Sequence, residues 1–382
     1  MKIEEFRLER WMSHWETRVR YDIAESGILP MSVDDLLGLL PEGARAATLE
    51  TLLATRLGYS EARGTQALRE AIAATYEETG PDNILVTTGA IEANYLLFHT
   101  LLEPGDNVIT IDPAYQQVQS VPAALGADVA FWTVRTDDGG FRFDLEDFER
   151  LVTGRTKLIA INTPHNPTGA ILGQDEVRHI AEVAASVGAM VVSDEAYRWL
   201  DLPSGEPLAP PARDLGDHAI SVGTFSKPFG LPGLRIGWIA GPEEVVARCW
   251  ALRDYITLSP GKLNDALALL ALDHRDAVVA RTRRIVAANL VTADAWFAEH
   301  ADLATWTRPR AGLLALMRYA AEMPSWELAD RLAADHSVML APGSAFGAGF
   351  EGYLRIGVGQ DPEIFAEGLR RTAACLRRLQ PA

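Results

Sequence analysis

Cysteine is scarce in this chain, with two residues, Cys249 and Cys375, among 382. Two thiols are too few for a disulfide framework or a cysteine-based metal site, and they fit a reducing compartment. The sequence therefore predicts a cytoplasmic protein and suggests neither zinc nor any other metal.

Long apolar runs are also missing. No stretch approaches the roughly 20 apolar residues that span a bilayer. Residues 1–6, Met-Lys-Ile-Glu-Glu-Phe, lack the apolar core of a signal peptide. We expect a soluble protein with no membrane partner.

The chain has fewer basic than acidic residues. Lys and Arg total 35 against 52 Asp and Glu, which gives a formal net charge of -17. Such a chain repels a phosphate backbone unless its basic residues cluster. The densest basic groups, Arg281 to Arg284 and Arg370 with Arg371, recur at helical spacing among apolar residues and are interpreted as solvated helix faces. No nucleic-acid partner is expected.

The remaining composition, 48% hydrophobic and 23% charged, is typical of a globular protein long enough for two domains. Near the N-terminus, Phe6, Trp11 and Trp15 suit one face of a helical arm that needs cover from the C-terminal part or a second subunit. Residues Tyr21–Met31 predict an extended connector that passes near a site.

Strand-length apolar runs alternate with helical stretches, such as Asp144–Leu151 and Gln174–Val187, through the middle of the chain. This βαβ alternation predicts an α/β fold with a mostly parallel central sheet and helices on both faces. The strand candidates are Ile84–Thr88, Val108–Ile111, Val129–Val134, Leu158–Asn162, Met190–Ser193 and Ala219–Gly223.

The C-terminal part predicts a smaller α+β domain. A helical region at about 263–298 precedes three strand candidates, Leu313–Tyr319, Val338–Leu340 and Tyr353–Val358. Arg355 is a charge inside the last of these apolar strands. Burying it is costly unless an anion pairs with it, either a ligand or the partner in a structural salt bridge.

The stretch Ser221–Trp238 places one lysine, Lys227, between small hydroxyl residues and a Gly-rich turn that leads to Arg235. An amine nucleophile beside an anion site is what pyridoxal phosphate (PLP) requires. Thr224, Ser226 and Arg235 would hold the phosphate while Lys227 forms a Schiff base. A surface lysine in a Gly-rich turn is the alternative.

Other polar candidates follow the predicted strands. Ligands of parallel sheets bind at the C-terminal ends of strands, where Tyr115, Asn166 and Asp194 fall. PLP needs an acid at its pyridine nitrogen, which Asp194 suits, and donors to its ring oxygen, which Asn166 and Tyr197 suit. Tyr115 is placed to stack on the ring. A helix that starts at Gly89 offers an anion site, with a plain β-α turn as the alternative.

In its motifs the chain resembles the fold-type I PLP enzymes of the class I/II aminotransferase family over nearly its whole length. The motifs occur in the order of the family: the Tyr59 loop, Thr88-Gly89-Ala90, Pro113-Ala-Tyr115, Asn166-Pro-Thr-Gly169, Asp194-Glu-Ala-Tyr197, Ser226-Lys227, Leu234-Arg235-Ile-Gly237, Pro342-Gly-Ser-Ala-Phe346 and Leu354-Arg355-Ile356.

This resemblance implies an aspartate aminotransferase-like fold. An arm and connector, residues 1–35, would join the small domain, residues 36–280 would form the large PLP-binding domain, and residues 281–382 the small domain. It also implies a homodimer, in which Tyr59 reaches the phosphate in the neighbouring subunit.

The resemblance implies residue roles as well. Lys227 would form the internal aldimine and transfer protons, Asp194 would pair with the pyridinium, and Asn166 and Tyr197 would contact the ring oxygen. Arg355 would bind the substrate α-carboxylate, with Gly27 and Asn166 beside it. The residues implied at the phosphate are Gly89, Ala90, Ile91, Thr224, Ser226, Arg235 and the neighbouring subunit's Tyr59.

Two segments, Asp22–Pro30 and Arg253–Lys262, depart from the family pattern and resemble the capreomycidine synthase-like subgroup of antibiotic-pathway PLP enzymes. The implied function is an aminotransferase-like enzyme that acts on an L-α-amino acid in secondary metabolism, through Schiff-base exchange at Lys227 and a Cα-quinonoid. Transamination, β-elimination or replacement, cyclisation, C–S cleavage of a cysteine conjugate and decarboxylation-coupled oxidative deamination all stay open.

The side chain of the substrate is not predicted. Five residues are candidate contacts, each with a structural role as the alternative. They are Arg63, Glu25, His165, Trp199 and Lys262.

Two other classes of protein fit less well. A binding or regulatory protein on the same scaffold would not need the intact Lys227 and Asp194. A nicotinamide-dependent dehydrogenase would need Gly-x-Gly-x-x-Gly after its first strand, which Thr88-Gly-Ala-Ile-Glu-Ala does not supply.

Overall fold

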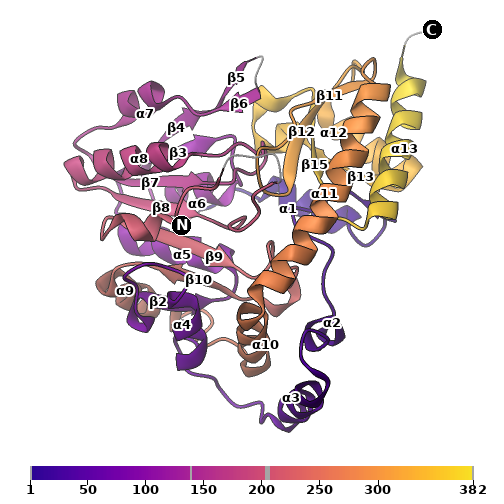
Figure 1. Ribbon diagram of the computed structural model, residues 1–382. Helices are drawn as coiled ribbons and strands as arrows, with labels where there is room; N and C mark the ends of the chain where they lie inside the picture. The colour runs from indigo at the N-terminus through magenta and orange to yellow at the C-terminus, as the bar shows by residue number, and fades with distance from the viewer. Residues whose placement is uncertain (1, 138–139, 203–206, 381–382) are drawn as a thin grey trace.

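The computed structural model describes residues 2–137, 140–202 and 207–380, and within them the larger sheet has seven strands in the order β2-β10-β9-β8-β7-β3-β4 (Figure 1). Strand β10 is antiparallel to β2 and β9, and the pairs from β9 to β4 are parallel. The predicted α/β fold is therefore confirmed. The strands are β2 (Ile84–Thr87), β3 (Asn107–Asp112), β4 (Asp128–Thr133), β7 (Thr156–Asn162), β8 (Met190–Asp194), β9 (Ala219–Thr224) and β10 (Gly237–Ala240).

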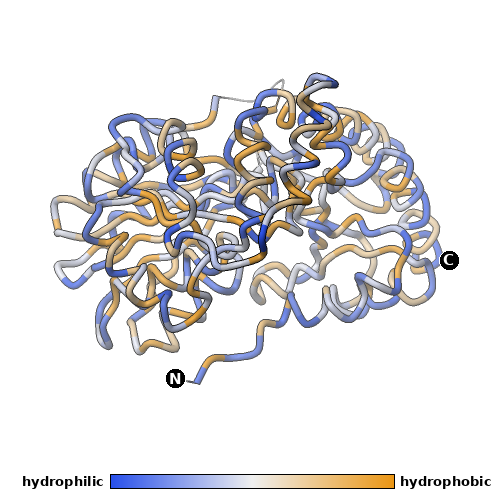
Figure 2. Tube along the Cα trace, turned by 90° about the horizontal axis from the view of Figure 1, so that it is seen from below, coloured by the Kyte–Doolittle hydropathy of each residue, from blue (hydrophilic) through white to orange (hydrophobic). Residues whose placement is uncertain are grey.

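Helices cover both faces of this sheet because its strands are apolar on both faces. In β7, Leu158 and Ala160 pack toward α5 and α9, whereas Ile159 and Ile161 pack toward α7 and α8. Figure 2 shows the apolar segments running through the interior. The helices around the sheet are α4 (Gln66–Ala73), α5 (Ala90–Leu101), α6 (Gln117–Ala124), α7 (Leu145–Leu151), α8 (Gln174–Val187) and α9 (Glu243–Arg253).

The C-terminal part forms a second, antiparallel sheet in the order β11-β12-β15-β14. The predicted run Val338–Leu340 divides, because β13 leaves this sheet and pairs with β1 of the connector. The elements of this part, with β1 and the hairpin β5-β6, are β1 (Tyr21–Asp22), β5 (Arg135–Asp137), β6 (Gly140–Arg142), β11 (Ala304–Trp306), β12 (Leu314–Tyr319), α12 (Ser325–His336), β13 (Val338–Met339), β14 (Ala341–Pro342), β15 (Tyr353–Gly357) and α13 (Pro362–Leu379).

The N-terminal arm contains helix α1 (Arg7–Trp15), which packs on the C-terminal part. Both indole N–H groups, of Trp11 and Trp15, donate to Asp330 Oδ1 of α12, over 2.8 and 2.9 Å. On the other side, the Arg7 amide donates to Gln116 Oε1 and the Gln116 amide group donates to the Glu5 carbonyl. The arm therefore bridges α12 and the start of α6.

The helical region expected at 263–298 consists of α10 (Lys262–Asp273) and α11 (Arg275–Glu299), which break at His274. In the described part of the chain, no helix is long and apolar enough to cross a membrane. Five short 3-10 turns are described: Pro81–Asn83, Ala212–Leu215, Pro232–Leu234, Gly343–Phe346 and Ala348–Phe350.

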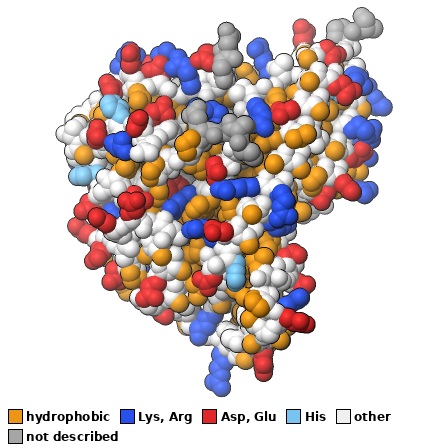
Figure 3. All heavy atoms as spheres, in the orientation of Figure 1, with side chains coloured by type: hydrophobic (Ala, Val, Ile, Leu, Met, Phe, Trp, Pro, Cys, Tyr) orange, Lys and Arg blue, Asp and Glu red, His pale blue; other side chains and the backbone are white. Residues whose placement is uncertain are grey.

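Helices α2 (Val33–Leu37) and α3 (Glu42–Ala54) project from the body at the bottom of Figure 1. Helix α3 has no buried residue among its 13 residues. Figure 3 shows acidic and basic side chains interspersed over the visible face, and apolar side chains on the projecting part where α3 lies. The chain after α3 carries the Tyr59 loop.

Candidate active site

A cavity of about 390 Å³ opens where the larger sheet meets the arm, the connector and β15. Asn162, Asp194 and Thr224 line it, and each is the last residue of its strand, β7, β8 or β9. This is the edge of a parallel sheet at which ligands bind. The predicted site residues that line the cavity are Ala90, Ile91, Tyr115, Asn166, Asp194, Tyr197, Thr224, Ser226, Lys227, Arg235 and Arg355.

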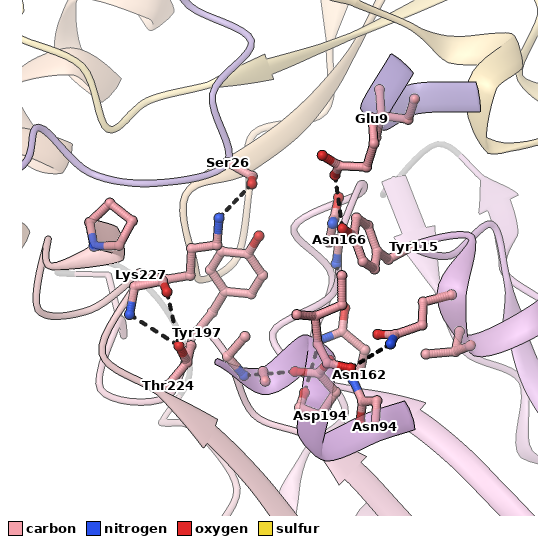
Figure 4. Close-up of a pocket in the computed structure, with 18 of the residues that line it drawn as sticks. Glu9, Ser26, Asn94, Tyr115, Asn162, Asn166, Asp194, Tyr197, Thr224 and Lys227 are labelled. Carbon is pink, nitrogen blue, oxygen red and sulfur yellow. Dashed lines mark hydrogen bonds between the residues drawn. The ribbon is translucent and has the colours of Figure 1, made fainter. Parts of the chain in front are cut away.

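Asp194 lies at the bottom of the cavity in Figure 4. Its carboxylate accepts hydrogen bonds from Asn94 Nδ2 over 2.9 Å and from the Ala196 amide over 3.0 Å. Burial raises the pKa of the Asp194 carboxyl, while these hydrogen bonds and the Lys227 charge oppose the rise. The carboxyl is thus held rigidly and is ready to pair with a cationic ring nitrogen.

Asn94 was missed by the sequence reasoning. It lies on α5, four residues after Ala90, so both face the cavity. The helical spacing from the Gly89-Ala90 motif is the signal that would have found it.

Lys227 reaches into the cavity from the loop after β9. Its Nζ donates to Ser26 Oγ over 2.7 Å (Figure 4). The same Nζ lies 3.7 Å from Glu25 Oε1. Burial lowers the pKa of the Lys227 amine, and the Glu25 carboxylate opposes this. A lysine with a lowered pKa has more of the neutral amine that acts as a nucleophile.

An anion cradle surrounds the start of α5. Gly89 precedes the helix with φ of 78°, and a Cβ there would stand 2.7 Å from Arg235 Nη2, so only glycine allows this approach. Across from it, Thr224 Oγ1 and Ser226 Oγ are 3.0 Å apart. Free helix N–H groups, two hydroxyls and a guanidinium are the donors that a phosphate requires.

Arg355 is 2% exposed on β15. Its Nη1 donates to Asn166 Oδ1 over 3.2 Å and its Nη2 to the Ala24 carbonyl over 2.8 Å. Its Nε has no hydrogen-bond partner among the described residues. A buried guanidinium bonded to neutral oxygens still lacks an anion, and a carboxylate fits it in bidentate geometry.

Two tyrosines close the sides of the cavity. The Tyr115 hydroxyl donates to Glu9 Oε1 over 2.8 Å. Burial raises the pKa of both Tyr115 and Tyr197, so both phenols are neutral donors. Glu9 was missed by the sequence reasoning, because its place depends on how α1 docks across the cavity.

Three predicted site residues do not line the cavity. Gly89 packs directly against the guanidinium of Arg235. Gly27 is buried because its backbone packs against Gly359, where a Cβ would come within 2.0 Å of the Gly27 carbonyl oxygen. Tyr59 is 85% exposed.

Of the five candidate substrate contacts, Glu25 alone is among the residues that line the cavity in the described structure. His165 is buried, with its ring nitrogens bonded to Thr168 Oγ1 and the Pro113 carbonyl. Arg63 pairs with Asp82, and Trp199 packs against Phe229. Lys262 begins α10.

Comparison with known proteins places the chain in a family. The Aminotransferase class I and II family matches residues 26–371. Capreomycidine synthase of Streptomyces vinaceus is 34% identical, over 89% of this chain and 86% of that protein. Arginine–pyruvate transaminase of Pseudomonas aeruginosa is 30% identical, over 97% and 95%. The solved structure of the PLP-dependent cyclase OrfR superposes with a TM-score of 0.88 and 33% identity, over 99% and 98%.

The chain therefore belongs to the class I and II aminotransferase family and is a PLP-dependent, aminotransferase-like enzyme. Its cavity fits the cofactor on structural grounds. The Gly89 cradle leaves room for an anion beside Arg235, and a nucleophilic lysine and a buried carboxyl stand at the same sheet edge.

Proposed function

We propose that this enzyme acts at the Cα of an L-α-amino acid with a positively charged side chain, in secondary metabolism. The observation that carries the proposal is a set of three carboxylates, Glu9, Glu16 and Glu25, that line the cavity in addition to Asp194. Two come from the arm and one from the connector. A cationic amine or guanidinium is the group that such carboxylates bind.

The charges in the cavity support this assignment. We propose that Arg235, with the start of α5, Thr224 and Ser226, holds the PLP phosphate, and that Arg355 holds the substrate α-carboxylate. Asp194 would pair with the ring nitrogen, and Asn166 and Tyr197 would contact the ring oxygen. With these cations assigned to anions, the carboxylates of Glu9, Glu16 and Glu25 face the remainder of the substrate.

Bound PLP supplies an electron sink for the bond that breaks at Cα. The residues of the chain do the rest. Lys227 is the residue that would bind the cofactor covalently, and its free amine takes up and returns the Cα proton. Ser26 holds Nζ at 2.7 Å, so the amine keeps one position. Arg355 fixes the carboxylate end of the substrate.

A second outcome, cyclisation, is favoured by a specific observation. The two segments that depart from the family pattern, Asp22–Pro30 and Arg253–Lys262, resemble the subgroup of capreomycidine synthase, and the cyclase OrfR shares the fold over 99% of this chain. Cyclisation needs a substrate that carries a leaving group at Cβ. After that group is eliminated, the side-chain nitrogen held by Glu25 near Lys227, once neutral, would attack Cβ and close the ring. Elimination, C–S cleavage and oxidative deamination remain outcomes of the test below.

We also propose a cytoplasmic homodimer. Leu53, Leu57, Tyr59 and Tyr255 are 78%, 78%, 85% and 90% exposed, which favours cover by a second copy. Tyr59 would then reach the phosphate of the neighbouring subunit. Sedimentation that shows a fully active monomer would contradict the dimer.

The packing of α1 against α12 supports the predicted division of the chain into a small domain, residues 1–35 with 281–382, and a large domain, residues 36–280.

The test is a screen of L-amino acids against the PLP-loaded enzyme, read by the change in its visible spectrum and by mass analysis of the product. L-Arginine and L-lysine are expected to react. L-Citrulline, the neutral isostere of arginine, and L-norleucine, which is lysine without its ε-amino group, are expected to react far less. The product mass distinguishes transamination, elimination, cyclisation and oxidation. A preference for neutral or acidic substrates would contradict the proposal.

A further inference from the structure

A buried ion pair lies behind the start of α5, outside the cavity. Glu92, in the first turn of α5, is 7% exposed, and its Oε2 accepts the Thr88 amide N–H over 2.5 Å. Its Oε1 accepts the Thr257 hydroxyl over 2.6 Å. The Glu92 side chain thus fixes the turn that leads into α5, in the manner of a capping box.

The partner of Glu92 is Arg253, the last residue of α9, which is fully buried. Arg253 Nε lies 3.7 Å from Glu92 Oε2 and 3.1 Å from Thr257 Oγ1, while Nη1 donates to the Ala62 carbonyl over 2.7 Å. Its own carbonyl accepts the amides of Ile256 and Thr257. Arg253 and Thr257 belong to the segment that departs from the family pattern.

Three parts of the chain meet at this pair: the turn before α5, the loop that carries Tyr59, and the turn after α9. The first holds the anion cradle, since Gly89 follows Thr88 directly. The second is anchored at Ala62, three residues after Tyr59. A buried ion pair adds little to net stability. This pair instead joins the three parts through its hydrogen bonds to the Thr88 amide, the Ala62 carbonyl and the Thr257 hydroxyl.

The charge on Glu92 also matters. Its carboxylate stands at the N-terminal end of α5, where it would repel a phosphate dianion bound to the same turn. Arg253 neutralises it. Loss of Arg253 would therefore both release the turn and leave an uncompensated negative charge behind the phosphate site.

We propose that Glu92, Arg253 and Thr257 form a positioning unit that sets the affinity for the PLP phosphate. None of the three lines the cavity, so they act through the turn before α5 and through the Tyr59 loop. The inference rests on PLP as the cofactor and on the proposed phosphate site, and it does not depend on the identity of the substrate.

The test is the PLP dissociation constant of the apoenzyme, measured by absorbance titration, together with its thermal unfolding temperature. Thr257→Val removes the hydroxyl that joins Glu92 and Arg253, and we expect affinity to fall by about fivefold, the effect of one hydrogen bond. Thr257→Ser keeps the hydroxyl and should stay within about twofold of the wild type.

Thr372→Val is the matched control. Thr372 is fully buried in α13, where its hydroxyl donates to the Gly368 carbonyl over 2.9 Å. This variant is expected to lower the unfolding temperature as Thr257→Val does and to leave the PLP dissociation constant unchanged. Equal PLP affinities for Thr257→Val and Thr372→Val would overturn the proposal.

Arg253→Met is expected to weaken PLP binding by more than tenfold, and Glu92→Gln added to it to recover part of the loss, because glutamine still accepts the Thr88 N–H but carries no charge. If PLP affinity does not recover in the folded double variant, the proposal that Arg253 neutralises the charge of Glu92 is contradicted. Where Arg253→Met does not fold, the comparison of Thr257→Val, Thr257→Ser and Thr372→Val decides the question by itself.

Discussion

On one side of the cavity, Asp194, Thr224 and Lys227 stand at or just after the ends of adjacent strands, and we refer to this as the strand-end side. On the other, Glu9, Glu25 and Arg355 come from the arm, the connector and β15, and we refer to this as the connector side. The strand-end side is positioned by the hydrogen bonds of the larger sheet. The connector side is positioned by how separate segments dock.

The two sides therefore differ in how strongly the fold constrains them: it fixes the residues of the strand-end side, whereas those of the connector side can vary. Asp194 could not move without displacing β8, whose neighbours β7 and β9 pair with it on both sides. Glu9 lies on the exposed face of α1 and Glu16 directly follows that helix, so either side chain could change without disturbing the sheet. We infer that the strand-end side defines the cofactor chemistry common to the family and that the connector side defines the substrate.

Lys227→Ala should have the largest effect, because it removes the group that we propose moves the Cα proton on the strand-end side. We expect kcat/KM for the substrate found in the screen to fall by about 10³-fold or more. Steady-state kinetics at saturating PLP measures this. Lys157→Ala, at an exposed lysine of β7, serves as the control and should match the wild type. Retention of a tenth of the activity by Lys227→Ala would refute its role.

Arg355→Lys tests the anchor of the connector side. Lysine keeps the charge but loses the bidentate fork, so KM should rise by about tenfold or more with a smaller change in kcat. The matching control is the decarboxylated amine of the same substrate. If Arg355 binds the α-carboxylate, the wild type and Arg355→Lys should bind this amine about equally, and an equal loss for both ligands would argue against that role.

Asp22→Asn should have a smaller effect, on stability. Burial raises the pKa of Asp22 from 3.8 to about 6, and the Glu25 charge adds to the rise. The folded protein therefore holds a proton that the unfolded chain releases, so stability falls as pH rises from 3.8 to about 6.

Asparagine can still accept the amide N–H groups of Ala24 and Glu25 that Asp22 Oδ1 now accepts. Asp22→Asn should thus be more stable than the wild type at pH 7, by about 3 kcal/mol, because a change of one pKa unit corresponds to about 1.36 kcal/mol. Denaturant unfolding of the apoenzyme at several pH values measures this. The difference should disappear below about pH 4. A constant difference at all pH values would show that Asp22 does not titrate as inferred.

The strand-end side was largely predictable from the sequence. Short apolar runs predict the strands, and the rule that ligands bind at strand ends predicts that Asp194, Asn166 and Lys227 lie at one edge of the sheet. Arg355 was predictable for another physical reason, since a charge in an apolar strand needs an anion.

The connector side was not predictable in the same way. Ser26 lies 201 residues from Lys227 in the chain, and their contact depends on the path of the connector. That path is fixed by backbone packing, as Gly357 shows, where a Cβ would stand 2.1 Å from the Glu25 carbonyl oxygen. Glu9 belongs to helix α1, and the hydrophobic periodicity of that helix predicts which face is buried but not which residues line the cavity beside it. That Tyr59 reaches the phosphate site of a neighbouring subunit remains a prediction.

The most direct test of the central claim compares L-arginine with L-citrulline, which replaces the guanidinium by a neutral urea of the same shape. In the wild type the ratio of their kcat/KM values should favour L-arginine strongly. In the double variant Glu9→Gln/Glu25→Gln it should fall by about tenfold or more, the effect of losing hydrogen bonds to a charged group. Glu182→Gln, at an exposed position of α8, should leave the ratio unchanged. An unchanged ratio in the double variant, with activity retained, would contradict the account.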